Sequence, residues 1–374
     1  MSNRFIPIAA PTLGERELEY VTDCLKSTWI SSRGEYLSRF ETAFAEFCAC
    51  PEAVACNNGT SALHLALLAL GLGPGDEVIV PTLTYIASVN AITYCGATPR
   101  FVDVSPDTWN MDPEHVKHAL GKATKAILAV HLYGEPADLG ALQELGDSHG
   151  IPIVEDAAEA HGATFAGRPV GSIGAIGTFS FYGNKIVTTG EGGMVVTHDA
   201  ELAERARLFR GQGQSPDRTY WFPVVGHNYR MTNIQAAIGL AQLEGLDTRL
   251  LRRAAIAARY RRNLGDLPGV AFQAGNDSAR SANWMVGLVL PVSSEQERDR
   301  VAKDARRAGI ETRPFFYPVH TMPPYAHLDP GPMPTADYLA ARGLCLPTWT
   351  GLTDEDVDIV SDTIASALAS PTHD

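Results

Sequence analysis

The sequence is poor in the features that mark nucleic-acid-binding, membrane or exported proteins. Its 30 Lys and Arg face 43 Asp and Glu, and the formal net charge of −13 argues against a nucleic-acid surface. No stretch reaches the roughly 20 apolar residues that a membrane span needs, and the first residues lack the basic and apolar regions of a secretion signal. We therefore expect a cytoplasmic protein that binds neither nucleic acid nor membrane and receives any anionic ligand in a local basic pocket.

Cysteine is also scarce. The six cysteines are scattered, with one C-x-C spacing and no C-x-x-C, a pattern that favours neither a zinc site nor a disulfide framework. We expect reduced thiols and no metal.

What the sequence does contain is a regular alternation of short apolar runs and amphipathic segments between Phe40 and Asp199. Such alternation is typical of an α/β layered sheet with mostly parallel strands, whose ligands gather outside the carboxyl ends of the strands. At about 150 residues per domain, the 374 residues make two or three domains. We place a large domain at residues 1–245 and a small α+β domain at residues 246–374, bridged by a long helix over residues 243–263.

Two further predictions concern the second domain. Ser293 and Gln296 have the spacing of a capping box and would begin a helix there. The bridging helix carries a run of arginines, and the acidity of the whole chain favours a solvated helix face over a nucleic-acid site. These arginines are Arg249, Arg252, Arg253, Arg259, Arg261 and Arg262.

Lys185 raises the main functional question, because it lies between the strand formers of "SFYGNK" and a turn that holds three glycines within four residues. The spacing does not fit the phosphate loop G-x-x-x-x-G-K-[ST]. The stretch "GLGPGDE" from Gly71 follows a helix and precedes a strand, the reverse of a dinucleotide fingerprint, so a helix C-cap explains it better. The remaining interpretation is an amine nucleophile that forms a Schiff base with a carbonyl compound or with pyridoxal phosphate.

Pyridoxal phosphate demands further partners, and candidates for each occur along the chain. Its ring nitrogen needs an acid that keeps it protonated, because the cationic ring is the electron sink. Its phosphate needs N–H donors at a helix N-terminus, and its ring needs an aromatic neighbour. The candidates are Gly59, Thr60, Ser61 and Ser180 for the phosphate, Tyr85 for stacking, and Asp156, at the end of a buried apolar strand, for the nitrogen.

Each candidate also has a purely structural explanation. Asp156 could be a helix N-cap, and the turn "NNGTS" could only cap its own helix. Tyr85 could belong to the core, and Lys185 could be a surface lysine. Taken together, the candidates follow one another along the chain in an order that few unrelated folds would require. This order favours the cofactor.

With these motifs the sequence resembles the DegT/DnrJ/EryC1/StrS family of sugar aminotransferases, within fold type I of the pyridoxal-phosphate enzymes (aspartate aminotransferase-like). The resemblance covers residues 28–349 and rests on "NNGTSALHLAL", "VEDAAEAHGA", "SFYGNK", "TTGEGGM" and "GHNYRMTNIQAAIGLAQLE". It implies a mixed, mostly parallel seven-stranded sheet with Lys185 as the catalytic residue. It also implies a homodimer with shared active sites, in which Asn228 reaches the cofactor phosphate of the partner chain.

Three more positions are interpreted through the resemblance. Glu159 stands where many relatives have glutamine, near the phenolic oxygen of the cofactor. His161 is either a buried histidine whose hydrogen bonds are satisfied or a residue that contacts the site residues without touching the cofactor. His227 stands where relatives often have an aromatic or small residue, which leaves the shape of the substrate site open.

Within the family, "RGQGQ" and "TRPFFYPVHTMPPY" are most similar to the branch that makes GDP-perosamine. That branch transfers the amino group of L-glutamate to C4 of GDP-4-keto-6-deoxy-D-mannose, with pyridoxamine phosphate as the intermediate form of the cofactor, so ping-pong kinetics are expected. Arg313 could bind the sugar nucleotide or clamp the donor carboxylate. The substrate candidates are Trp29, Ser31, Arg33, Arg313, Tyr317 and His320.

Other functions stay open at this point. A 4- or 3-aminotransferase for a UDP- or dTDP-linked keto sugar would share most of these motifs. A dehydratase of the same fold has histidine in place of the lysine, so Lys185 argues against it. A non-catalytic regulatory or scaffold protein is the last alternative, since fold alone does not establish activity.

Overall fold

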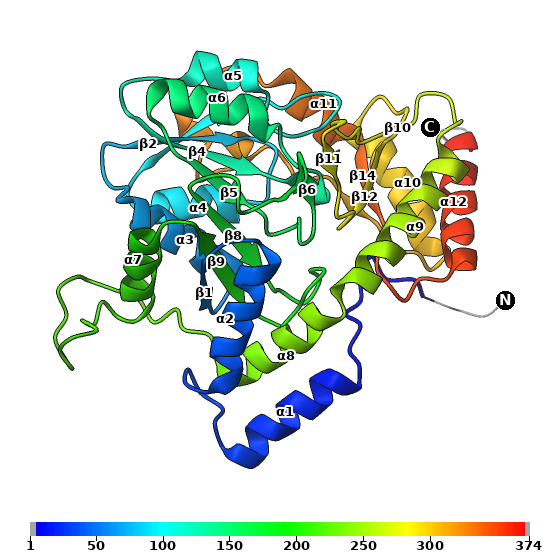
Figure 1. The fold of residues 1–374 in the computed structure, drawn as a ribbon. Helices are drawn as coiled ribbons and strands as arrows, with labels where there is room; N and C mark the ends of the chain where they lie inside the picture. Colours follow the sequence, from blue (N-terminus) through cyan, green and yellow to red (C-terminus); the bar gives the residue numbers. More distant parts are fainter. Residues whose placement is uncertain (1–4, 371–374) are drawn as a thin grey trace.

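A seven-stranded sheet forms the centre of the molecule in the computed structural model, which describes residues 5–370 (Figure 1). Its strand order is β1-β9-β8-β5-β4-β2-β3. Strand β9 is antiparallel to both of its neighbours, and the other pairings are parallel. The mixed, mostly parallel sheet predicted from the sequence is therefore confirmed. The strands are β1 (Glu52–Cys56), β2 (Glu77–Pro81), β3 (Thr98–Val102), β4 (Thr124–Val130), β5 (Ile153–Asp156), β8 (Ile176–Ser180) and β9 (Gly193–Thr197).

Helices cover the sheet, and this cover explains why its strands are continuous apolar runs rather than alternating ones. Strands β5, β8 and β9 are buried along their whole length. Helix α3 is apolar nearly all round, because it packs against β8 and β9 as well as against two other helices. The helices of this part are α1 (Glu15–Ser27), α2 (Glu35–Phe47), α3 (Gly59–Leu70), α4 (Ala87–Tyr94), α5 (Pro113–Ala119), α6 (Leu139–His149), α7 (Ala200–Arg210) and α8 (Asn233–Glu244).

A smaller part follows α8, at the right of Figure 1. Its four-stranded antiparallel sheet has the order β10-β12-β14-β13 and packs with long helices. A third, three-stranded sheet joins the two parts, because β11 of the later chain pairs with β6. These elements are β6 (Thr164–Phe165), β7 (Arg168–Pro169), α9 (Leu246–Leu264), β10 (Ala271–Phe272), β11 (Ala279–Arg280), β12 (Val286–Val289), α10 (Glu295–Arg307), β13 (Arg313–Pro314), α11 (Pro334–Arg342), β14 (Gly343–Leu346) and α12 (Asp354–Ala369).

The buried apolar side chains form two clusters that do not follow the predicted division at residue 245. Ile6 pairs with Ile310 and belongs to the smaller cluster, with α9, α10 and α12. Trp284 and Phe315 belong instead to the cluster of the central sheet. The boundary between residues 245 and 246 stays a prediction, and the chain crosses between the two cores more than once.

Two helix predictions in this region were wrong in detail. The bridging helix is broken at Gly245 (φ −100°, ψ 11°), so that α8 ends at Glu244 and α9 begins at Leu246. Helix α10 is capped by Ser294 rather than Ser293, because Ser294 has the extended backbone of an N-cap and its Oγ accepts from the Glu297 N–H. The final helix, α12, begins after Thr353, and Thr353 and Asp356 form its capping box.

The solvated face predicted for the arginine run of α9 was wrong at several positions. Arg253 is 4% exposed, and its Nη1 donates to the carbonyls of Trp284 (2.9 Å) and Thr348 (3.0 Å). Arg252 and Arg259 form ion pairs with α12. The helix face that was predicted to be solvated therefore holds parts of the molecule together.

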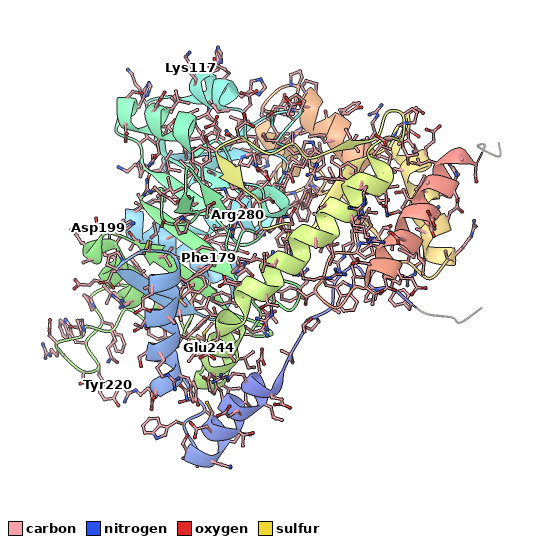
Figure 2. The ribbon with its side chains drawn as sticks, turned by 45° about the vertical axis from the view of Figure 1, so that its right-hand side comes forward. Lys117, Phe179, Asp199, Tyr220, Glu244 and Arg280 are labelled. Atoms are coloured by element: carbon pink, nitrogen blue, oxygen red, sulfur yellow. The ribbon has the colours of Figure 1, made fainter. Side chains whose placement is uncertain are left out.

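Two segments stand away from the body. Helix α1 packs mainly on α8, and the loop between α7 and α8 extends outward with Tyr220 near its tip (Figure 2). Within residues 5–370 we find no helix that is both long and apolar enough to cross a bilayer.

Candidate active site

A cavity of about 710 Å³ lies where the chain leaves β1, β2, β5 and β8, at the carboxyl ends of these strands. That is where ligands of open α/β sheets bind. Nine of the residues singled out from the sequence line it, although they are spread over more than 250 positions. They are Gly59, Thr60, Ser61, Tyr85, Asp156, Glu159, Ser180, Lys185 and Arg313.

The start of α3 forms one wall. Asn58 caps the helix, and its Oδ1 accepts from the Ser61 N–H at 2.8 Å. The first N–H groups of a helix have no partner within the helix, so this turn can receive an anion. The cap accounts for Asn58 but not for Gly59, where an added Cβ would lie 2.6 Å from the Cβ of Ser180. Glycine is thus required for α3 and β8 to approach each other at this wall.

Asp156 is the last residue of β5, near the middle of the sheet, and is buried. Its Oδ2 accepts from the Ser88 hydroxyl at 2.6 Å, and its Oδ1 accepts from the Ala158 N–H at 3.1 Å. The helix-cap explanation is wrong, because turns and not a helix follow β5. Asp156 is an oriented carboxylate in the cavity wall.

Lys185 follows β8 in a turn that its own N–H closes by donating to the Tyr182 carbonyl at 2.9 Å. The side chain is only 13% exposed, so the surface explanation is wrong. Its Nζ lies 3.6 Å from Glu159 Oε1 and 4.1 Å from the centre of the Trp284 ring. A carboxylate and an aromatic face therefore flank the amine.

Glu159 is held by the Tyr133 N–H, which donates to its Oε2 at 2.8 Å. Burial raises the pKa of Glu159 to about 7, and the nearby Lys185 opposes that rise. His161 is fully buried against Phe179 and Phe181. Burial, with Lys185 as a nearby cation, lowers the pKa of His161 to about 3, so this ring is neutral near pH 7.

Tyr85 lies at the open side of the cavity. It is 58% exposed, so the core explanation is wrong, and its ring centre lies 5.7 Å from that of Phe316. A half-exposed aromatic at a cavity mouth can stack on a planar ligand.

The remaining predicted residues do not line this cavity. Asn228 is exposed and pairs through its main chain with Gly211.

Two of the predicted substrate residues, Tyr317 and His320, follow strand β13 in the chain. His320 Nδ1 forms a hydrogen bond with Thr82 Oγ1 at 2.6 Å. Tyr317 is partly exposed, and the Arg298 guanidinium lies over its ring. The others, Trp29, Ser31 and Arg33, are exposed between α1 and α2.

His227 lies beside the cavity rather than in it. Its ring stacks on Tyr229, which does line the cavity, and lies next to His64. Burial lowers the pKa of His227, as it lowers that of His64 to about 4.

Sequence reasoning missed several residues of the cavity wall, chiefly Trp284, Ser88 and Tyr229. Trp284 donates from Nε1 to the Asn184 carbonyl at 2.8 Å across 100 positions of sequence. No local spacing connects it to Lys185. Ser88 follows Tyr85 by three residues, and its place in helix α4 was the one available signal.

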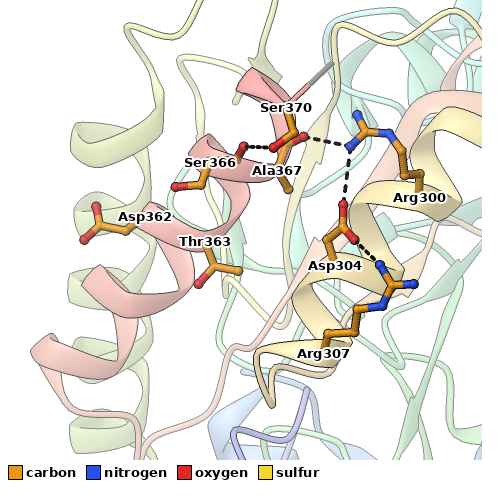
Figure 3. A pocket seen from close by; sticks show the side chains of 8 residues that line it. All are labelled: Arg300, Asp304, Arg307, Asp362, Thr363, Ser366, Ala367 and Ser370. Carbon is orange, nitrogen blue, oxygen red and sulfur yellow. Dashed lines mark hydrogen bonds and ion pairs between the residues drawn. The ribbon is translucent and has the colours of Figure 1, made fainter. Parts of the chain in front are cut away.

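A second cavity, of about 660 Å³, lies between α10 and α12 (Figure 3). Its charged groups neutralise one another, since Asp304 pairs with both Arg300 and Arg307. Its lining within residues 5–370 contains no His, Cys or Lys, so we assign it no chemistry.

The residues of the first cavity fit pyridoxal phosphate. Two buried amide oxygens at its wall, Asn57 Oδ1 and Asn184 Oδ1, have no hydrogen-bond partner within residues 5–370. Unpaired buried polar atoms are costly unless a ligand or water satisfies them. A helix start with unpaired N–H groups, an oriented carboxylate and a largely enclosed lysine are suited to the phosphate, the ring nitrogen and the aldehyde. The described residues contain no cluster of three or more His, Cys, Asp or Glu side chains suited to a metal ion.

Known proteins resemble the chain over nearly its whole length. The model of the DegT/DnrJ/EryC1/StrS aminotransferase family matches residues 11–365. The GDP-perosamine synthase of Caulobacter vibrioides is 51% identical over 361 residues, which are 95% of this chain and 96% of that protein. The GDP-perosamine synthase of Escherichia coli O157:H7 is 48% identical over 363 residues, 96% of this chain and 98% of that protein.

A solved structure shows the same fold. The "putative sugar aminotransferase Spr1654" of Streptococcus pneumoniae, in its PLP form, superposes with a TM-score of 0.92 at 30% identity, and the match covers 98% of this chain and 99% of that chain. The prediction of an aminotransferase fold of type I is confirmed.

Proposed function

The chain belongs to the DegT/DnrJ/EryC1/StrS aminotransferase family, and from that premise we propose that it transfers the amino group of L-glutamate to C4 of GDP-4-keto-6-deoxy-D-mannose, giving GDP-perosamine. Pyridoxal phosphate is the cofactor. The observation that carries the proposal is the meeting of Lys185, Asp156 and the start of α3 in one cavity. The sugar is supported by relatives at 48–51% identity that are GDP-perosamine synthases.

The chain's own residues would hold the cofactor as follows. The start of α3, with Ser180, would bind the phosphate. Asp156 would accept a hydrogen bond from the ring nitrogen, and Tyr85 would stack on the ring. When bound, the cofactor supplies an electron sink for the carbanion that forms at the amino-bearing carbon.

Lys185 would anchor the aldehyde end and then act as the base. In the first half of the reaction its free Nζ would take the proton from Cα of glutamate and pass it on to the cofactor. In the second half it would carry a proton back and deliver it to C4 of the sugar. Glu159, 3.6 Å away, would orient the amine between these transfers. The walls around Lys185 limit the access of water, which would compete for the proton.

The sugar nucleotide would enter at the open side, beside Tyr85. Arg313 lines the cavity there and is partly exposed, so its guanidinium is available for a pyrophosphate or a carboxylate. The other predicted substrate residues lie outside this cavity, and we propose that they act in a homodimer with shared active sites. In such a dimer Asn228, Trp29, Ser31 and Arg33 of one subunit would face the site of the other.

The dimer is supported by exposed apolar side chains on the two segments that stand away from the body. Soluble monomers rarely expose large apolar patches. Helix α1 and the residues after it expose Leu18, Leu25, Trp29 and Ile30, and the loop after α7 exposes Tyr220, Trp221, Phe222 and Val225. The six cysteines are all free thiols, which supports our placing the enzyme in the cytoplasm.

The test is a substrate panel. Purified enzyme with L-glutamate would be given GDP-, UDP- and dTDP-linked 4-keto-6-deoxy sugars, and amino-sugar formation would be followed by mass spectrometry. We expect amination of the GDP-linked sugar. Amination of only a UDP- or dTDP-linked sugar would reassign the substrate, and a protein that cannot take up pyridoxal phosphate would favour the scaffold alternative.

A further inference from the structure

Trp284 lines the cavity and contacts Lys185, but it has no part in the cofactor site proposed above. The Lys185 Nζ lies 4.1 Å from the centre of its ring. A cation over an indole face is the most favourable of the cation–π pairs, and the attraction grows as water is excluded. Lys185 is 13% exposed and Trp284 is 4% exposed, so this pair is largely desolvated.

Trp284 also fixes the main chain that carries the lysine. Its Nε1 donates to the carbonyl of Asn184, the residue before Lys185. The Trp284 carbonyl in turn accepts from the buried Arg253 guanidinium. The Trp284 side chain thus contacts both the Lys185 amine and the main chain of the residue before Lys185.

Tyr133 links the two groups that flank the amine. Its N–H donates to Glu159 Oε2, and its ring stacks on Trp284 with centres 6.4 Å apart and planes 20° apart. Tyr133 has a left-handed backbone (φ 57°), which a bulky residue adopts only where its surroundings require it. The carboxylate and the indole are therefore held in a fixed relation by a common neighbour.

We propose that Trp284 is a positioning residue that holds the Lys185 amine against Glu159 and inside the cavity, ready to receive the cofactor. Two contacts carry the proposal: the indole face over Nζ and the Nε1 bond to the lysine's turn. The inference rests on the proposed function only in that Lys185 is the attachment point. It can be tested without turnover.

The experiment measures how fast a limiting amine-acylating reagent modifies Lys185 in the full-length protein prepared free of pyridoxal phosphate. Peptide mass spectrometry gives the rate at Lys185 and, in the same sample, at Lys117, an exposed lysine of α5 that serves as internal reference. The variants are Trp284→Leu, which removes the ring, and Trp284→Phe, which keeps a ring face but removes the Nε1 donor.

We expect acylation of Lys185 in Trp284→Leu to be about 3- to 30-fold faster than in the unmodified protein, the range that corresponds to the loss of one cation–π contact. Lys117 should not change, and Trp284→Phe should recover part of the protection. A Lys185 rate in Trp284→Leu equal to that of the unmodified protein overturns the proposal. So does a Trp284→Phe protein that is modified as fast as Trp284→Leu.

A second preparation covers the case in which Trp284→Leu does not fold, as judged by circular dichroism. The chain has five tryptophans, and replacing all of them with fluorinated tryptophan keeps the shape while weakening the negative ring face. Faster modification of Lys185 at an unchanged Lys117 rate supports the proposal, and an unchanged Lys185 rate overturns it. Absence of aminotransfer by the unmodified protein, with Lys185 protected as described, would instead count against the proposed function and leave the positioning role intact.

Discussion

Lys185, Glu159 and Asp156 bring three ionisable side chains into one cavity wall, each nearly enclosed by protein. We expect Lys185→Ala to abolish aminotransfer, because no other lysine among residues 5–370 lines the cavity to anchor the cofactor or move the Cα proton. The measurement is single-turnover amination with glutamate. Lys117→Ala, on the outer surface, is the matched control and should retain full activity. Turnover by Lys185→Ala would end the role assigned to this residue.

Glu135 carries a prediction about stability rather than catalysis. It is 5% exposed, and its Oε1 has no hydrogen-bond partner within residues 5–370. Burial raises its pKa from 4.5 to about 7. The folded protein therefore keeps this proton to higher pH than the unfolded chain does. The stability linked to Glu135 is fully present below about pH 4.5 and is lost as pH rises through 7.

Glu135→Gln should remove this loss. We expect the variant to gain on the order of 1–3 kcal/mol of unfolding free energy relative to the unmodified protein at pH 8, and little at pH 4.5. Urea unfolding at the two pH values gives the comparison, with the exposed Glu144→Gln as control. An equal difference at both pH values would show that ionisation of Glu135 is not the cause.

At the residue scale, the sequence predicted the groups that follow strands and begin helices, because those positions are fixed by local pattern. Asp156 and Lys185 were found in this way. Trp284 was not, because it reaches Lys185 from the bend before β12, about 100 positions later in the chain. Arg253 was misjudged for a similar reason. Its guanidinium donates hydrogen bonds to carbonyls 31 and 95 positions away, and no local sequence spacing predicts these partners.

The close approach of α3 to β8 can be tested at the scale of these two elements. An added Cβ at Gly59 would lie 2.6 Å from Ser180 Cβ, so Gly59→Ala must push the anion-binding turn away from the strand that precedes Lys185. Overpacking of this kind costs about 1–3 kcal/mol. We expect the Kd for pyridoxal phosphate to rise roughly 5- to 150-fold.

Gly73→Ala is the control for that titration, because an added Cβ there meets no atom within 4 Å. Absorbance titration of the cofactor-free protein gives both values of Kd. If Gly59→Ala binds pyridoxal phosphate as tightly as Gly73→Ala does, the start of α3 does not bind the phosphate.

The class of the central sheet, with mostly parallel strands, could be anticipated from apolar runs and helical periodicity, since each is a property of a short segment. The order of its strands was not predicted, because it depends on which segments pair. The helix boundaries that were predicted wrongly depend on backbone geometry. Gly245 interrupts a helix whose apolar pattern continues on both sides, and Ser293 and Ser294 are equally good caps until the backbone selects one. Pattern alone does not distinguish such neighbours.

For the whole molecule, the proposed dimer predicts that activity depends on a surface outside the cavity that holds Lys185 in the same chain. Leu18 and Leu25 are exposed one heptad apart on α1. We expect Leu18→Glu with Leu25→Glu to shift the protein from dimer to monomer in sedimentation equilibrium and to lower kcat/KM at least tenfold, because Asn228 of the partner would be lost. The exposed Leu251→Glu on α9 is the control. A fully active monomer would contradict the shared site.

The most direct measurement for the central claim is reduction of the pyridoxal-phosphate-loaded protein with borohydride, followed by peptide mapping. The account predicts loss of the visible absorption of the cofactor and a pyridoxyl phosphate group on one peptide, at Lys185. A group found on another lysine, or a protein that takes up no cofactor, would contradict it.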